Sequence, residues 1–223
     1  MKLWAIAAMA VLTAACAPPS PPTSAPTSSA PAVAEVNPAR IDRVRSALPG
    51  GYEVAAYTGP PVPMSVWGFT GPAVAEPPQC QALAAPAIDP ATARGWSASG
   101  PGGIVYAVAG ASPAAPDPAV LAECAQWTLG SERTTGSVTS APAPDVDAAH
   151  TVAMSSVATT VVEGGTQTRT HAETFVAYLG DHVCFVALVT DPGSTYPALD
   201  PEFGAQLLAE TVSAVRGDAA PRG

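Results

Sequence analysis

The sequence predicts a single α+β domain over residues 37–217, in which helices flank a curved antiparallel sheet. Segments with the period of amphipathic helices lie towards both ends of this region, and most segments between them are typical of strands. These strands are joined by short glycine-rich turns rather than by helices, which indicates antiparallel hairpins instead of βαβ units.

The N-terminal part of the domain is predicted to contain one helix and two strands. The helix has Asn37 as its N-cap and Pro38 in its first turn, and its apolar side chains fall on one face. These side chains are Ile41, Val44 and Leu48. Two short apolar runs then predict strands at residues 52–58 and 64–70.

The middle of the domain contains the clearest hairpin signal in the chain. Residues 94–99 and 104–110 are predicted strands on either side of the turn sequence Gly-Pro-Gly-Gly. A short helix is predicted before this hairpin, at residues 76–87, and a further helix after it, at residues 117–129.

The C-terminal part is predicted to form three strands and a closing helix. The strands cover residues 150–162, 170–180 and 182–190, and glycine-containing turns separate them. The helix covers residues 200–217 and places its apolar side chains on one face. These side chains are Phe203, Leu207, Leu208, Val212 and Val215.

The first fifteen residues are predicted to be a lipoprotein signal peptide. Lys2 precedes an apolar run, residues 3–12, that is too short to span a bilayer, which needs about 20 apolar residues. Small residues lead directly into Cys16, which is the pattern of a bacterial lipobox. We expect Cys16 to carry diacylglycerol and an acyl chain such as palmitate. The alternative is an ordinary secretory signal with an incidental cysteine.

A tether is predicted to follow the lipidated cysteine, so that residues 16–36 link the membrane to the domain. Residues 17–34 are almost entirely Ala, Pro, Ser and Thr, and cannot bury enough apolar surface to offset the entropy of ordering. This composition is also that of segments that accept O-linked sugar. Residues 218–223 are expected to be a disordered tail.

Composition excludes several functions. The formal net charge is −9 and Lys2 is the only lysine, so the mature chain lacks the basic surface that nucleic acids and anionic lipids need. The missing lysine also excludes a P-loop, a Ser-x-x-Lys acyl enzyme and Schiff-base catalysis.

Lipidation of Cys16 would leave three cysteines, and two of them should pair in an oxidising compartment. Cys80 and Cys124 lie on predicted helices, whereas Cys184 lies in an apolar strand where a thiol behaves as a small hydrophobe. We therefore predict a Cys80–Cys124 disulfide, with a bridge to Cys184 as the alternative.

No pattern in the sequence specifies an active site. The histidines are His150, His171 and His182, and their spacing does not define a metal site. The nucleophile-elbow pattern Gly-x-Ser-x-Gly does not occur. We expect no enzyme, no catalytic residue, no metal and no cofactor.

The aromatic residues provide the candidate binding site. Trp67 and Phe69 are two residues apart in the predicted strand 64–70, which would place both rings on one face. One interpretation is an apolar ligand cleft between the sheet and a covering helix. The other is that both rings belong to the core of a protein with few aromatic residues.

Four segments carry a resemblance to a known family. RIDRVRSALPGGYEVA, PPQCQALAAPAI, WSASGPGG and FVAYLGDHVCFVAL follow a lipobox and a tether in this order. They resemble an uncharacterised family of exported mycobacterial lipoproteins that contain a domain of unknown function. More distantly, the helix-borne cysteines and late strands resemble the extracellular sensor domain of the mycobacterial kinase PknH. That domain is an α+β sandwich with two disulfides and an apolar cleft. This chain has only three cysteines in the domain itself, so the resemblance implies at most one shared bridge.

These observations predict a lipid-anchored protein on the extracytoplasmic face of the cell membrane. We expect a non-catalytic domain that is sensor-like or binds an apolar ligand. The alternative is a protein-interaction or surface-antigen lipoprotein without a small-molecule site. The expected partners are the membrane, through the anchor, and an apolar small molecule or an envelope protein. No nucleic-acid partner is expected.

Overall fold

The structure is a computed structural model that describes residues 35–113, 115–191 and 193–218. The predicted signal peptide, Cys16, the tether up to residue 34 and the tail from residue 219 lie outside the described residues.

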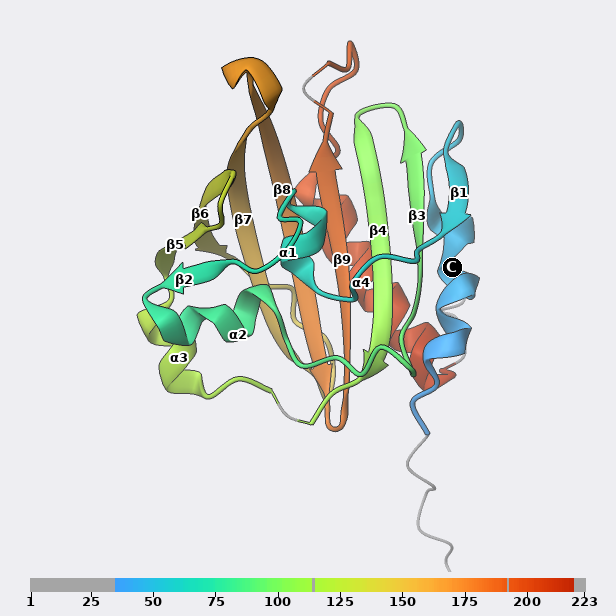
Figure 1. Ribbon diagram of the computed structural model, residues 1–223. Coiled ribbons are helices and arrows are strands. Elements are labelled where there is room, and N and C mark those ends of the chain that lie inside the picture. The colour runs from blue at the N-terminus through green and yellow to red at the C-terminus, as the bar shows by residue number, and fades with distance from the viewer. Residues whose placement is uncertain (1–34, 114, 192, 219–223) are drawn as a thin grey trace, which may run out of the picture. The chain divides into compact units, whose positions relative to one another are not determined.

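The described chain forms one nine-stranded antiparallel sheet with helices, which confirms the predicted α+β class (Figure 1). The strand order across the sheet is β1-β3-β4-β9-β8-β7-β6-β5-β2. The strands are β1 (Glu53–Ala56), β2 (Val74–Glu76), β3 (Arg94–Gly100), β4 (Gly103–Ala111), β5 (Gln126–Gly130), β6 (Thr134–Ala141), β7 (His150–Val161), β8 (Gln167–Leu179) and β9 (His182–Thr190). The α-helices are α1 (Pro63–Val66), α2 (Gln81–Ala84), α3 (Pro118–Glu123) and α4 (Pro201–Arg216), and the 3-10 helices are η1 (Pro38–Ala47), η2 (Pro78–Cys80) and η3 (Glu163–Gly165).

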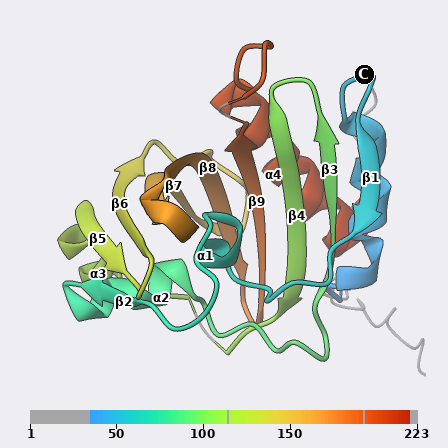
Figure 2. The ribbon, with the colours of Figure 1, turned by 45° about the horizontal axis from the view of Figure 1, so that its top comes forward.

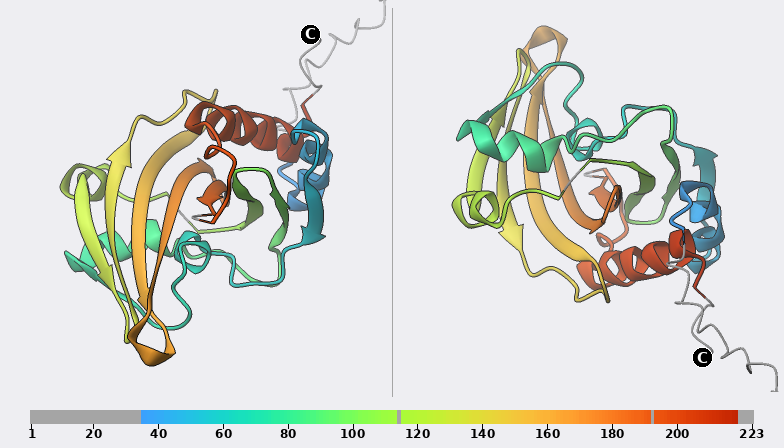
Figure 3. Two further views of the ribbon diagram at one scale, coloured as in Figure 1. Left: turned by 90° about the horizontal axis from the view of Figure 1, so that it is seen from above. Right: turned by 90° about the horizontal axis from the view of Figure 1, so that it is seen from below.

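The sheet is covered on both faces, and strand β9 shows this most clearly. Val183, Phe185 and Ala187 pack into one hydrophobic cluster, whereas the alternate residues Cys184, Val186 and Leu188 pack into another. Because successive side chains of a strand point to opposite faces, a strand buried on both sides is an unbroken apolar run. We call the side covered by α4 and η1 the α4 face, and the side covered by α1, η2 and α2 the α2 face (Figures 2 and 3).

The α4 face is covered by elements that the sequence predicts. The side chain of Asp200 caps α4 by accepting a hydrogen bond from the Glu202 backbone N–H at 2.9 Å. Gly217 ends the helix in the left-handed conformation, with φ of 79°. The indole N–H of Trp96, on β3, donates to the Ile41 carbonyl at 3.1 Å and so ties the sheet to η1.

The prediction of a strand at residues 64–70 is wrong. Residues Pro63–Val66 form helix α1, and Trp67 is its C-cap. Proline fits the first helical position because its fixed φ suits the helix and its missing N–H is not needed there. The backbone N–H groups of Trp67 and Phe69 both bond the Met64 carbonyl, at 3.2 Å each, and Gly68 has a φ of 101°. The two rings therefore do not share a strand face.

The prediction of one helix over residues 117–129 is also wrong in its second half. Helix α3 ends at Glu123, and residues Gln126–Gly130 form strand β5, in which Trp127 and Leu129 are buried while Gln126 and Thr128 are exposed. The sequence does not predict strands β2 and β6. Strand β6 consists mostly of Thr, Ser and Gly, and Val138 is its one large apolar residue, so it lacks a clear alternating pattern.

Candidate functional site

Trp67 and Phe69, the predicted ligand-binding residues, lie in the hydrophobic core of the α2 face. Their exposed fractions are only 1% and 3%. The indole N–H of Trp67 donates to the hydroxyl of Thr174 on β8 at 2.9 Å, so this buried polar group is satisfied inside the protein. Phe69 packs on β6, where a Cβ on Gly136 would lie 3.1 Å from the ring. This arrangement agrees with the interpretation of both rings as core residues.

The cysteines are arranged as predicted. Cys80 and Cys124 form a disulfide that joins η2 to the end of α3, and both residues are fully buried. Cys184 is free and fully buried on the α4 face. Burial raises the pKa of its thiol to about 12, so Cys184 is protonated at neutral pH and is not a nucleophile.

The histidines do not converge on one site. His150 and His171 are exposed, and the Nδ1 atom of His182 lies 2.8 Å from the Asp181 carboxylate. The hydrogen bond to His182 lowers the pKa of Asp181. Within residues 35–218, apart from residues 114 and 192, no group of three or more His, Cys, Asp or Glu side chains is placed to hold a metal ion.

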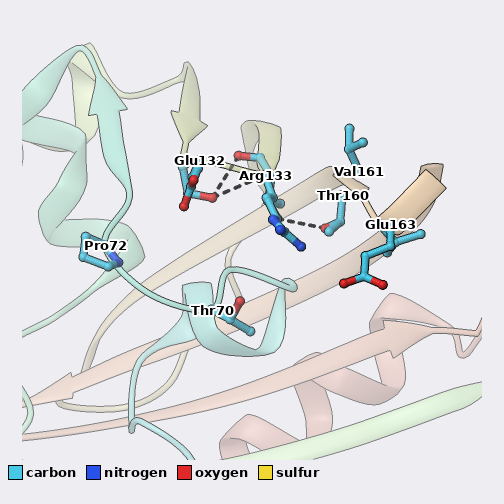
Figure 4. A pocket seen from close by; sticks show the side chains of 10 residues that line it. Thr70, Pro72, Glu132, Arg133, Thr160, Val161 and Glu163 are labelled. Atoms are coloured by element: carbon cyan, nitrogen blue, oxygen red, sulfur yellow. Dashed lines mark hydrogen bonds between the residues drawn. The ribbon is translucent and has the colours of Figure 1, made fainter. Parts of the chain in front are cut away.

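A pocket of about 370 Å³ lies next to the Trp67–Phe69 segment (Figure 4). Three stretches of chain converge on it: the loop after Phe69, the β5–β6 turn and the end of β7 with the start of η3. We call it the hairpin pocket. It is lined by Thr70, Pro72, Ser131, Glu132, Arg133, Thr134, Thr160, Val161, Val162 and Glu163.

Local hydrogen bonds fix the walls of the hairpin pocket. In the β5–β6 turn, the Ser131 backbone N–H donates to the Thr134 carbonyl at 2.8 Å, and the Thr134 N–H donates to the Ser131 hydroxyl at 3.2 Å. In the other wall, Val162 donates its backbone N–H to the Thr166 carbonyl at 2.8 Å. The chain turns there through Gly164 and Gly165, whose φ values of 79° and 78° favour glycine.

Hydroxyl groups line the inner part of the hairpin pocket. The hydroxyls of Thr134 and Thr160 are 2.9 Å apart and form a hydrogen bond between β6 and β7. Thr134 is 3% exposed, whereas Thr160 is half-buried. Each hydroxyl has one hydrogen to donate, so a bond donated by Thr134 leaves the hydrogen of Thr160 free for a ligand.

Charged side chains surround the opening of the hairpin pocket. Glu132, Arg133 and Glu163 are all exposed, and Figure 4 shows Arg133 and Glu163 projecting into the space that faces Thr70. In the described part of the chain, neither glutamate forms an ion pair with Arg133. The guanidinium donors of Arg133 and the acceptors of both carboxylates are therefore available to a bound molecule.

Two other depressions are larger but shallower. One, of about 510 Å³, lies beside Ile88 and Ser112, and the other, of about 520 Å³, lies over β5 and β6. Both are open surfaces rather than clefts. Ligand sites are concave, with volumes of about 300–1,000 Å³ and a few convergent polar groups, and the hairpin pocket fits this description better.

The sequence does not identify the residues of the hairpin pocket. Its polar side chains come from the β5–β6 turn and the β7–β8 connection, which are 30 residues apart in the chain and which sequence patterns describe only as loops. Strand β6, which brings them together through its pairing with β7, was not predicted. The only local signal is the Glu-Gly-Gly turn.

No helix in the part of the chain that the structure describes is long and apolar enough to cross a membrane. No curated protein matches the chain. Among solved structures, an uncharacterized protein from Mycobacterium smegmatis, the ortholog of Rv0999, has a TM-score of 0.58 and 19% sequence identity, over 83% of this chain and 100% of that chain. The extracellular domain of PknH from Mycobacterium tuberculosis has a TM-score of 0.45 and 16% identity, over 82% of this chain and 93% of that chain.

A family model supplies the remaining comparison. The model described as "Domain of unknown function (DUF5642)" matches residues 37–216, which is nearly the whole predicted domain. The match confirms the resemblance to a family of unknown function that the sequence predicts. The chain belongs to the DUF5642 family.

Proposed function

We propose that this chain is a lipid-anchored protein of the cell envelope, whose domain recognises a ligand without catalysing a reaction. The lipobox at Cys16 supports the anchor. The buried Cys80–Cys124 disulfide supports an extracytoplasmic location, because disulfides persist in oxidising compartments and are rare in the cytosol.

The convergence of polar groups on the hairpin pocket is the observation that carries the recognition role. Hydroxyl, carboxylate and guanidinium groups from three stretches of chain face one concave space. The pocket is lined by no histidine or cysteine, so its serine and threonine hydroxyls have no imidazole beside them to act as a base.

The second candidate is a protein-interaction or surface-antigen lipoprotein without a small-molecule site. The burial of Trp67 and Phe69 favours it over the apolar-ligand site first predicted there, because a ligand would have to displace core packing to reach either ring. Mass spectrometry of lipid extracts from the natively purified protein discriminates between an apolar-ligand site and a protein without a small-molecule site. A stoichiometric lipid beyond the acyl anchor would support the apolar site at Trp67 and Phe69.

The anchor is tested by metabolic labelling with an alkyne fatty acid in cells that express the full chain. We expect the wild type to be labelled and Cys16→Ala to be unlabelled. Cys184→Ala is the matched control, because it also removes one thiol but leaves the lipobox intact. Equal labelling of wild type and Cys16→Ala would refute the anchor.

A further inference from the structure

We propose that the hairpin pocket binds a neutral polyhydroxylated ligand, that is, a saccharide. This inference rests on the proposed recognition function and adds the chemical class of the ligand.

The hydrogen-bonding groups of the hairpin pocket are mixed, as a hydroxylated ligand requires. A sugar hydroxyl both donates and accepts, so its site must offer acceptors and donors close together. Glu132 and Glu163 supply carboxylate acceptors, and Arg133 supplies guanidinium donors. The Thr70 and Thr160 hydroxyls serve in either role. A carboxylate has two oxygens in one plane and a guanidinium group has three nitrogens in one plane, so each can bind two neighbouring hydroxyls at once.

The charge balance argues against an anionic ligand. Two carboxylates and one guanidinium give the pocket a formal charge of −1, on a chain of net charge −9. A phosphate or carboxylate would be attracted by Arg133 and repelled by Glu132 and Glu163. A neutral ligand can use all three side chains, because hydrogen bonds to charged groups are stronger than those between neutral groups.

One side of the hairpin pocket is apolar. Val161 and Val162 are 42% and 39% exposed, although both are large aliphatic residues, and Pro72 lies on the opposite rim. The C–H face of a sugar ring covers such a surface, while the hydroxyls at the ring edge reach the polar groups. A lipid chain would instead leave the three charged side chains and the threonine hydroxyls desolvated and unpaired.

The backbone around the hairpin pocket is held by hydrogen bonds within the protein. The Ser131–Thr134 and Val162–Thr166 backbone hydrogen bonds hold its two hairpin walls, and the Thr134–Thr160 hydroxyl pair joins β6 to β7 at its base. A preformed site avoids the entropic cost of ordering on binding. The volume of about 370 Å³ has room for a mono- or disaccharide.

The test is a titration of the ¹⁵N-labelled full chain with neutral saccharides, followed by amide chemical shifts. The probes are glucose, mannose, galactose, arabinose and the disaccharides sucrose and maltose. Glucose 6-phosphate and a long-chain fatty acid are the anionic and apolar comparisons. We expect saturable shifts at Thr70, Ser131–Thr134 and Thr160–Glu163 with at least one neutral probe. Absence of localised shifts with every neutral probe would overturn the proposal.

Three variants assign the binding to the proposed side chains. Arg133→Met, Glu163→Gln and Thr160→Val should each weaken binding, and each of the first two by about tenfold because a charge-assisted hydrogen bond is lost. Arg169→Met and Glu210→Gln are matched controls on exposed residues outside the pocket, and they should leave the affinity unchanged. Equal affinity of Arg133→Met and wild type would contradict the assignment.

Failure of the ligand class is distinguishable from failure of the proposed function. If glucose 6-phosphate or the fatty acid shifts the same amides and no neutral probe does, the hairpin pocket is a recognition site but not for a saccharide. If a neutral probe binds and Cys16→Ala is labelled like wild type, the ligand class holds and the anchor is wrong.

Discussion

The two faces of the sheet are both buried, but they are covered in different ways. The α4 face is covered by one 16-residue amphipathic helix and η1. The α2 face is covered by short segments: α1 and α2 have four residues each, and η2 has three. Helices this short are not stable alone, because nucleation costs more than a few hydrogen bonds return. The α2 face therefore depends on its tertiary contacts and its disulfide.

This difference explains where the hairpin pocket forms. A long helix covers its face continuously, and Leu207, Leu208, Val212 and Val215 are all nearly inaccessible. The short segments of the α2 face cover the middle of the sheet with Trp67, Phe69 and Leu83 but leave the ends of β6 and β7 open. Polar side chains from the neighbouring turns line that opening.

The largest expected effect is the loss of core packing at Trp67. Trp67→Ala removes a fully buried ring and should lower the free energy of unfolding by about 3–5 kcal/mol. Trp96→Ala on the α4 face should cost a similar amount, because Trp96 is also fully buried with a satisfied N–H. Urea unfolding followed by circular dichroism measures both. A near-neutral Trp67→Ala would mean that this ring is not part of the core.

Removal of the disulfide should destabilise the α2 face more than the α4 face. The Cys80→Ala, Cys124→Ala double variant should lose about 2–4 kcal/mol, because the bridge constrains a separation of 44 residues in the unfolded chain. Native-state amide hydrogen exchange of this variant should show that α2 and α3 open at a lower free energy than α4. Uniform loss of protection on both faces would contradict the separate construction of the α2 face.

A smaller effect should come from Cys184 at alkaline pH. Burial raises the pKa of its thiol from 9.0 to about 12, so the unfolded chain loses this proton first. Stability is fully present below pH 9 and falls as pH rises from 9 towards 12, by about 1 kcal/mol between pH 8 and pH 10. Burial also raises the pKa of Tyr178 to about 12, which adds to the fall above pH 10. Denaturant unfolding at both pH values should show a smaller fall for Cys184→Ala. An identical fall in both proteins would contradict the burial of the thiol.

The sequence predicts the elements of the α4 face and the central strands better than the elements of the α2 face. The strands of residues 150–190, the closing helix and the Arg94–Ala111 hairpin are confirmed because their apolar residues repeat with the period of the element over a long stretch. The α2 face was predicted less well. A proline at the first turn made residues 63–66 helical where an apolar run indicated a strand, and β6 has too few apolar residues to show its period.

The residues that line the hairpin pocket could not be predicted from the sequence, although the predicted binding residues Trp67 and Phe69 lie close to it in the chain. The sequence assigned the binding role to Trp67 and Phe69, and both rings are buried. The pocket beside them depends on the pairing of β6 with β7, which brings residues 131–134 against residues 160–163. Such contacts between distant turns have no signature in a single sequence.

The most direct test of this account compares two variants in two measurements, stability in urea and affinity for the neutral saccharide that gives the strongest amide shifts. Trp67→Phe removes the N–H that Thr174 accepts inside the core, and Arg133→Met removes a charged group at the rim of the hairpin pocket. We predict that Trp67→Phe loses about 1–3 kcal/mol of stability and keeps its affinity, whereas Arg133→Met keeps its stability and binds about tenfold more weakly. The opposite result, in which Trp67→Phe loses binding at unchanged stability and Arg133→Met binds normally, would place the site at the aromatic rings and contradict the account.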